Sequence, residues 1–215
     1  YSDLKQKDKH LETCQKAVEL IKKLADNPPS YYFPFLAMAL NNLAVCYYET
    51  HEYGKAIELN KEALNIRISL AAENQDAFLP DLSQSLNNLA AGFVANEEYI
   101  KAVELYKEAL AINKKLANQY PAVYLPQLAD SLFNMALCLK RMKDYDEAVN
   151  AIGKSVGIFR ELEKKNSDKY SEKLSKSLKE MADILLKLGK DEDAEKARSK
   201  AEQIQKLFQN SPTII

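Results

Sequence analysis

Apolar residues recur three and four positions apart along most of the chain, with polar residues between them. This spacing places the apolar side chains on one face of an α-helix, whereas a half-buried strand would show strict alternation. The first such stripe runs through residues 1–26 and stops before Pro28 and Pro29, because a proline removes a backbone donor and breaks a helix. We therefore expect an opening helix over 1–26 and an all-α chain.

The helical pattern repeats with a fixed period. The sequence Leu-Asn-Asn-Leu-Ala begins at Leu40 and at Leu86, and looser copies begin at Leu132 and Leu178, so successive copies lie 46 residues apart. A fixed period of roughly 20 to 50 residues is the signature of a solenoid, in which each repeat packs mainly on its neighbours. The chain is therefore predicted to form a single array.

Each repeat is predicted to be a helical hairpin. Pro34, Pro80 and Pro126 suit the first turn of a helix, so we expect the first helices of three hairpins to begin there. Small residues at fixed places in the second helix, such as Ala56 and Ala63, would let the two helix axes approach to about 8 Å. The expected hairpins cover 34–72, 80–118, 126–165 and 172–209, residues 1–26 correspond to the second helix of a repeat that lacks its first helix, and 210–215 form a tail.

The second repeat resembles the tetratricopeptide repeat, whose order of large, small and aromatic positions it follows. The residues that carry the resemblance are Leu86, Leu89, Ala90, Phe93, Tyr99, Ala102, Tyr106 and Ala109. The resemblance covers nearly the whole chain, with departures in the fourth repeat at Asp191 and Arg198. It implies an all-α, right-handed superhelical solenoid whose first helices line a concave groove.

The period separates this chain from the common form of the repeat. The usual length is about 34 residues, and we expect the extra residues here to lie in a longer second helix and in the linker between hairpins. Long repeats with the Leu-Asn-Asn-Leu-Ala signature are similar to those of kinesin light chains and of microbial repeat arrays.

The asparagines of this signature are the first candidate binding residues. Asn42, Asn88 and Asn134 share one register in three first helices, and the resemblance implies that they line the groove as a ladder of amides facing an extended peptide. Asn41 and Asn87 precede the first two of them and are assigned to the same groove. The alternative is that the amides bond the neighbouring repeat and fix the superhelix.

The predicted groove is neutral at one end and basic at the other. Tyr48 belongs to the neutral end, and Lys140, Arg141 and Lys179 belong to the basic end. A groove of this kind would suit a peptide with hydrophobic side chains followed by acidic residues or a carboxylate. The other interpretation is that these charges only keep the end of the array soluble.

Composition excludes several classes of partner. The formal net charge is −1 with 28% charged residues, so the chain lacks the basic excess of a nucleic-acid-binding domain. RNA binding along the basic end stays a minor alternative. No uninterrupted apolar run approaches the ~18 residues of a membrane span, so no membrane partner is expected.

Candidate catalytic and metal-binding groups are sparse. The two histidines, His10 and His51, belong to no HExxH motif, and the five glycines form no phosphate-binding loop. Cys14, Cys46 and Cys138 are scattered without a CxxC pair, which favours small buried residues in a reducing compartment over a disulfide or a zinc site. We expect no enzymatic activity, no cofactor and no metal, and a cytoplasmic location.

The sequence favours a non-catalytic scaffold that binds a peptide or a segment of a protein partner. The alternative is a sensor or regulatory arm of a larger enzyme or nucleotide-dependent switch, since the chain begins partway through a repeat. The missing first helix would also leave an apolar side of the opening helix uncovered, which invites dimerisation through the amino end. The residues on that side are Leu11, Ala17, Val18 and Leu24.

Overall fold

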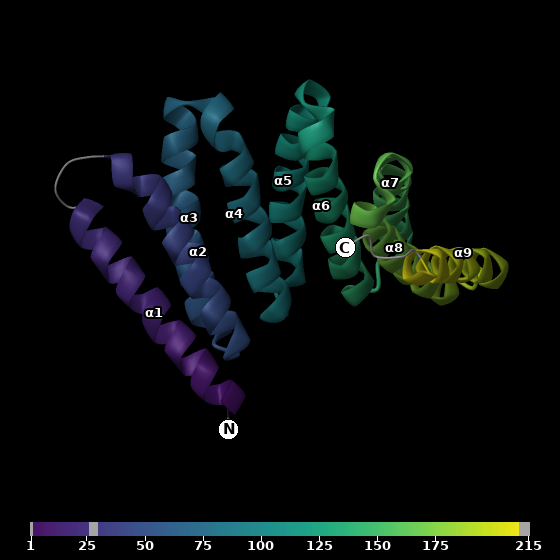
Figure 1. The fold of residues 1–215 in the computed structure, drawn as a ribbon, viewed down its shortest axis with the longest axis horizontal. Coiled ribbons are helices and arrows are strands. Elements are labelled where there is room, and N and C mark those ends of the chain that lie inside the picture. Colours follow the sequence, from purple (N-terminus) through teal and green to yellow (C-terminus); the bar gives the residue numbers. More distant parts are fainter. Residues whose placement is uncertain (1, 26–29, 211–215) are drawn as a thin grey trace. The chain divides into compact units, whose positions relative to one another are not determined.

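The computed structural model describes residues 2–25 and 30–210, and these form α-helices joined by short turns, without strands (Figure 1). The all-α prediction is confirmed. A short 3-10 turn, η1 (Ser30–Tyr32), precedes α2. The helices are α1 (Ser2–Ala25), α2 (Phe33–Glu49), α3 (Tyr53–Glu73), α4 (Gln75–Ala95), α5 (Tyr99–Gln119), α6 (Pro121–Arg141), α7 (Tyr145–Lys165), α8 (Ser167–Lys187) and α9 (Asp191–Asn210). The predicted tail begins at residue 210, and residues 211–215 lie outside the described residues.

The chain forms two compact units that divide within α5, between Ile112 and Asn113. In unit 1, α1, α2, α3 and α4 pack in chain order, and α2 also contacts α4. In unit 2, α6, α7, α8 and α9 pack in the same way, and α6 also contacts α8. Each unit is therefore built of hairpins that stack on their sequence neighbours, as the solenoid prediction requires.

The 46-residue period is divided evenly between two helices. Helices α3 to α8 are each 21 residues long. A three-residue turn joins the two helices of a hairpin, and a single residue joins one hairpin to the next. The joints are Asn74, Tyr120 and Asn166. The residues beyond the usual period therefore lengthen the helices, and the expected linker is reduced to one residue.

Three predicted helix starts were wrong. Pro34 lies in the first turn of α2, as expected, but Pro80 and Pro126 lie inside α4 and α6, which begin five residues earlier. The start of α4 is set by a local cap, since the Asn74 side chain accepts a hydrogen bond from the backbone amide of Ala77. Helix α6 begins at Pro121, which suits the first turn of a helix, and Tyr120 before it makes no side-chain capping bond. Asn166 caps α8 in the same way, so that helix begins at Ser167 rather than at the expected residue 172. A proline one turn further in forfeits one intrahelical hydrogen bond, which the helix tolerates near its start.

The turn that closes each first helix uses a left-handed residue. His51, Glu97, Lys143 and Gly189 occupy the same register and have φ between 60° and 70°. The residue that follows donates its amide back across the turn, as from Glu52 to the Tyr47 carbonyl at 2.8 Å. This geometry satisfies the last carbonyls of the helix and is usually made by glycine.

Small residues set the closest approach of the two helices in a hairpin. Ala56 and Ala63 are fully buried, as predicted. Where a serine replaces an alanine at these contacts, its hydroxyl donates across the helix pair, as from Ser83 to the Ala109 carbonyl at 3.3 Å. Ser155 makes the same bond to the Ala129 carbonyl at 2.9 Å. The hairpins therefore gain a hydrogen bond without losing the close contact.

Among the described residues, α6 is long and apolar enough to cross a membrane by length and composition alone. In the fold, however, α6 packs on α7 and contacts α8, and its buried residues include Leu132, Ala136 and Leu139. This packing buries part of the apolar surface of α6.

Candidate peptide-binding surface

One side of α2 remains exposed along the whole helix. Phe35, Met38, Asn42, Val45 and Glu49 follow one another at three-and-four spacing and are all exposed. The exposed fractions are 45% for Phe35 and 50% for both Met38 and Val45. Three large apolar residues in a row on an exposed helix face are typical of an interaction surface.

Helix α4 continues this surface because α2 and α4 are in contact. In the same register α4 presents Gln84, which is exposed, and Asn88 and Ala91, which are half-buried. The Gln84 amide donates to Asn88 Oδ1 at 2.8 Å. We call the exposed and half-buried residues along this register the amide face, defined as Phe35, Met38, Asn42 and Val45 of α2 and Gln84, Asn88 and Ala91 of α4.

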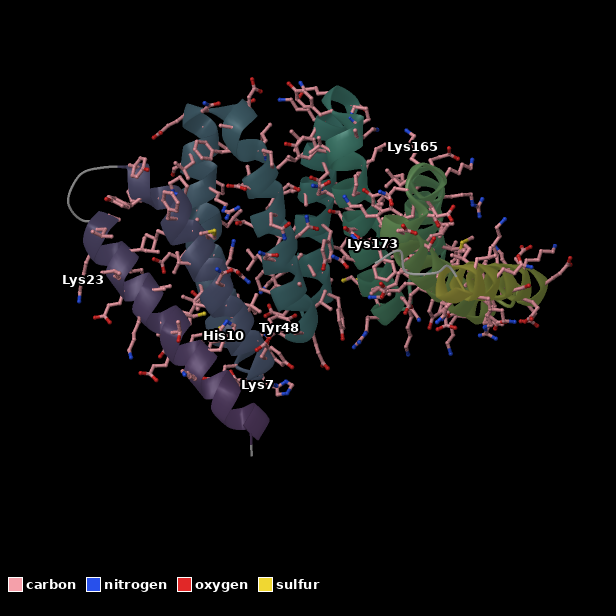
Figure 2. The ribbon with its side chains drawn as sticks, viewed as in Figure 1. Lys7, His10, Lys23, Tyr48, Lys165 and Lys173 are labelled. Atoms are coloured by element: carbon pink, nitrogen blue, oxygen red, sulfur yellow. The ribbon has the colours of Figure 1, made fainter. Side chains whose placement is uncertain are left out.

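The seam beneath the amide face is made by residues that the sequence assigned to the groove. Asn41 is only 7% exposed, and its Nδ2 donates to Ser85 Oγ at 3.3 Å. The Tyr48 hydroxyl donates to the Ala91 carbonyl, and burial raises the pKa of Tyr48 (Figure 2). Asn41 is therefore removed from the accessible surface, because one step along a helix turns the side chain by about 100°. Asn41 and Tyr48 hold α2 against α4.

Several buried polar atoms in unit 1 lack a hydrogen-bond partner within the described part of the chain. They are Asn41 Oδ1, Asn60 Oδ1, Arg67 Nε and Asn87 Oδ1. Each of these side chains is bonded through another atom, as when Asn87 Nδ2 donates to the Ser83 carbonyl at 2.9 Å. A buried polar atom without a partner costs about 1–3 kcal/mol. The region under the amide face is thus not arranged for greatest stability.

In unit 2, ion pairs join α6 and α8, which are first helices of hairpins as α2 and α4 are in unit 1. Lys140 of α6 lies 2.9 Å from Glu180 and 3.5 Å from Asp183, both on α8. Lys173 of α8 lies 2.6 Å from Asp130 of α6 (Figure 2). We call these residues the charged face.

The predicted basic end is therefore mostly occupied by internal partners. Burial disfavours the charge of Lys140, but the hydrogen bond and charge of Glu180, followed by Asp183, outweigh burial and raise the Lys140 pKa. Lys179 Nζ donates to Gln205 Oε1 at 2.8 Å. Arg141 is exposed at the end of α6. Asn134 is half-buried on the same helix, in the register of Asn42 and Asn88.

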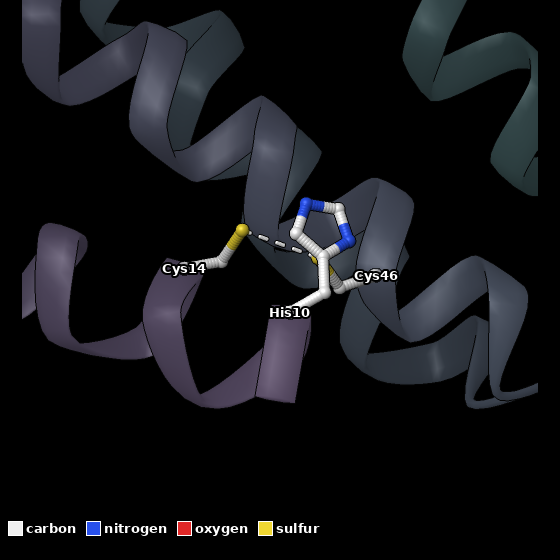
Figure 3. Close-up of side chains that lie close together, drawn as sticks. All are labelled: His10, Cys14 and Cys46. Carbon is white, nitrogen blue, oxygen red and sulfur yellow. Dashed lines mark hydrogen bonds between the residues drawn. The ribbon is translucent and has the colours of Figure 1, made fainter. Parts of the chain in front are cut away.

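The fold brings together three side chains for which no site was expected. His10 and Cys14 lie one turn apart on α1, and both face Cys46 of α2 (Figure 3). The Cys46 thiol lies 3.2 Å from Cys14 Sγ and 3.6 Å from His10 Nδ1. The signal that the sequence offered was the four-residue spacing of His10 and Cys14, which places both on one helix face.

Comparison with protein families identifies the repeat. The family model described as tetratricopeptide repeat matches residues 35–115 and 81–161, two overlapping stretches that together cover more than half of the chain. Comparison with curated proteins finds no match in sequence.

Solved structures of repeat proteins share the fold. A putative kinesin light chain with nearly identical TPR-like repeats from Podosopora anserina is 22% identical, with a TM-score of 0.68 over 98% of this chain and 96% of that one. The apo form of RapI is 18% identical, with a TM-score of 0.73 over 94% of this chain and 67% of that one. A Rap protein complexed with Competence and Sporulation Factor is 16% identical, with a TM-score of 0.68 over 95% of this chain and 51% of that one. At these identities the similarity establishes the fold alone.

Proposed function

This chain belongs to the tetratricopeptide repeat family, and we propose that it is a non-catalytic scaffold whose amide face binds an extended segment of a partner protein. Members of this family are generally protein-interaction scaffolds, and the repeat itself is typically non-catalytic. The observation that carries the proposal is the exposed stripe of Phe35, Met38 and Val45 with Asn42 in its middle.

The proposed contacts follow from the chemistry of the face. An extended segment has unpaired backbone donors and acceptors at regular intervals, and an asparagine amide can satisfy both kinds. Asn42 and Asn88 supply such amides, while Met38 and Val45 supply apolar contact for alternate side chains of the segment. In unit 2, Asn134 of α6 is proposed to make the same kind of contact.

The preferred segment is neutral and apolar. On the charged face Lys140 and Lys173 already have carboxylate partners within the fold, so an acidic segment would have to displace them. Arg141 is proposed as the cation that an acidic end of the partner would meet. An acidic contribution to binding is therefore expected to be weak and sensitive to salt.

The test uses peptides selected from a displayed random library on this chain. Replacing Met38 by Glu, or Asn42 and Asn88 together by Ala, should weaken the selected peptides by at least tenfold in fluorescence anisotropy. Asn65→Ala is the matched control, because Asn65 is an exposed asparagine on the second helix of the same hairpin. Equal affinity of a selected peptide for all of these variants would refute the amide face as the binding surface.

The second candidate is a sensor or regulatory arm of a larger enzyme or switch protein. It is favoured by the Rap protein solved in complex with Competence and Sporulation Factor, of whose length this chain spans about half. The sequence that flanks residues 1 and 215 in the gene distinguishes the two. An enzymatic or nucleotide-binding domain fused to these repeats would support the regulatory arm, and flanks made only of further repeats would exclude it.

We further propose that the chain can pair through α1. Leu24 is exposed there and Leu20 is 60% exposed, whereas Val18 is buried against α2 and Leu11 is half-buried, so the surface is narrower than the sequence implied. Sedimentation at rising concentration tests the pairing, and Leu20→Lys should abolish it. A chain that stays monomeric at millimolar concentration would rule it out.

A cytoplasmic location is also part of the proposal, because the three cysteines are thiols and thiols persist in reducing compartments. Fractionation of cells that produce the chain tests this. Recovery in an oxidising compartment with cross-linked cysteines would contradict it.

A further inference from the structure

We propose that His10, Cys14 and Cys46 bind a zinc ion that ties α1 to α2. The three ligand atoms lie within 4.8 Å of one another. Two of them come from one face of α1 and the third from the facing side of α2 (Figure 3). The site is distinct from the amide face and does not depend on it.

The donor set is one that zinc prefers. Two thiolates and an imidazole form known zinc sites in proteins, in which a water or an external ligand takes the fourth position. With Zn–S bonds of about 2.3 Å, two sulfurs of a tetrahedral site lie about 3.7 Å apart. The Cys14 and Cys46 sulfurs are 3.2 Å apart, so a small rotation of the half-buried Cys14 side chain would reach that spacing.

The environment leaves room for a fourth ligand on one side only. His10 is exposed and Cys14 is half-buried, whereas Cys46 is 2% exposed. An ion held by the three would therefore have protein on the Cys46 side and solvent on the His10 side. A closed structural site needs four protein ligands, so the proposed site is of the open type.

This ligand set belongs to one helix pair and is not a consequence of the repeat. The residues of α7 and α8 in the same register are Ala148, Ile152 and Ile184, all fully buried. In α3 and α4 they are Ala56, Asn60 and Gly92. Packing alone is thus satisfied without an imidazole or a thiol at these positions, so the three side chains are not needed to build the interface.

Zinc binding at this site requires Cys46 to lose its proton. Burial, followed by the hydrogen bond to Cys14, raises the pKa of Cys46 to about 12, which opposes that loss, so the zinc–sulfur bond must offset this cost. Zinc forms bonds to both sulfurs and to the His10 imidazole, and the two thiol protons pass to solvent. Glu49 adds negative charge near Cys46 and favours the cation further.

The test is metal binding by the reduced, chelator-treated 215-residue chain. Competition with a chromophoric chelator should give one Zn²⁺ per chain, and Co²⁺ should give thiolate charge-transfer bands together with the d–d absorption of a tetrahedral ion. His10→Ala should weaken Zn²⁺ binding at least tenfold, and Cys14→Ala at least a hundredfold. Both positions have exposed surface on α1, so these variants are expected to fold, which far-ultraviolet circular dichroism verifies.

Cys138→Ser is the matched control. Cys138 has the register of Cys46, but the residues of α5 that correspond to His10 and Cys14 are Ala102 and Tyr106, which offer neither imidazole nor thiol. Its zinc affinity should equal that of the unaltered chain. Hydrogen exchange gives a second readout, since bound zinc should slow exchange in α1 and leave α7 unchanged.

Four results would overturn the proposal. They are a cobalt spectrum without thiolate bands, His10→Ala and Cys14→Ala variants that bind zinc as tightly as the unaltered chain, binding of Cu⁺ without Zn²⁺, and oxidation of Cys14 and Cys46 to a disulfide at the same rate with and without zinc. The last result would show that the close sulfurs are a thiol pair only.

Discussion

The two units of this chain share a 46-residue period, but the side chains buried between successive hairpins differ in chemistry between them. On α3 of unit 1 the inward positions hold Asn60 and Arg67, which are 4% and 6% exposed. On α7 of unit 2 the same register holds Ile152 and Phe159, which are 0% and 1% exposed. The fold therefore tolerates polar groups at these positions but does not require them.

The unit with buried polar side chains on α3 also holds the amide face and the His10, Cys14 and Cys46 cluster. The buried polar atoms without partners in the described residues belong to unit 1. Natural proteins most often break the packing rules at functional sites, where stability is given up for another property. The proposed function places the amide face on unit 1, with Asn134 and Arg141 of unit 2 as further contacts.

The largest expected effect comes from truncating a buried apolar side chain of unit 2. Phe159→Ala should destabilise the chain by about 3–5 kcal/mol, because it empties a fully buried position in the core of unit 2. Urea unfolding followed by circular dichroism measures the loss. Phe35→Ala is the control, since Phe35 is 45% exposed and should cost little. Similar losses for the two variants would show that the core of unit 2 has been misidentified.

Replacing the buried arginine of unit 1 should have a different effect, since it should not lower the free energy of unfolding. The Arg67 side chain donates to the Asp81 carbonyl at 2.7 Å and lies 3.5 Å from the Asp81 carboxylate, while its Nε has no partner among the described residues. Arg67→Met should leave stability unchanged or raise it by about 1 kcal/mol, because replacing a buried charge by a residue of similar volume removes its desolvation cost.

Urea unfolding measures this change as well. Asp81→Ala is the companion variant, since it keeps the buried guanidinium but removes its carboxylate, and it should lower stability. If Arg67→Met instead lost more than about 1 kcal/mol, the guanidinium would be a supporting part of unit 1 and the contrast with Phe159 would fail.

The sequence was sufficient to predict the repeats because packing contacts in a hairpin are short in sequence and recur at one period. Ala56 and Ala63 were assigned correctly for this reason. It was not sufficient at the helix starts, where Pro80 was read as a boundary although the cap at Asn74 was the stronger local signal. The 46-residue period fixes the spacing of the helix starts but not their position, so it could not distinguish a start at Pro80 from one at Gln75.

The candidate sites were harder to predict because they depend on rotation about a helix and on register between helices. Asn41 and Asn42 are adjacent in sequence, yet one is buried in the seam and the other is exposed. The approach of Cys46 to Cys14 depends on how α1 slides along α2, and no periodic pattern in a single sequence encodes that offset. The charges of the predicted basic end were also hard to interpret, since Lys140 lies on α6 and its partner Glu180 lies on α8.

The turns provide a smaller test in which both units should respond alike. Glu97 in unit 1 and Lys143 in unit 2 have φ of 60° and 64°, a conformation that costs a residue with a side chain about 1 kcal/mol. Glu97→Gly and Lys143→Gly should each stabilise the chain by up to about that amount, and Gly189→Ala should destabilise it similarly. Thermal unfolding measures all three. Opposite signs in the two units would mean that their turns differ.

The smallest expected effect is the ion pair that distinguishes the charged face. A double-mutant cycle with Lys140→Met and Glu180→Gln should give a coupling of about 0.5–1 kcal/mol at low salt, because both side chains are about three-quarters buried. Since the folded pKa of Lys140 is raised, the contribution is fully present below the ordinary lysine value near pH 10 and is lost as pH rises through the folded value. Added salt should reduce the coupling.

The exposed Lys61–Glu58 pair on α3 is the control and should couple more weakly. A coupling of zero would mean that Glu180 does not hold Lys140. The charged face would then be as available to a partner as the amide face.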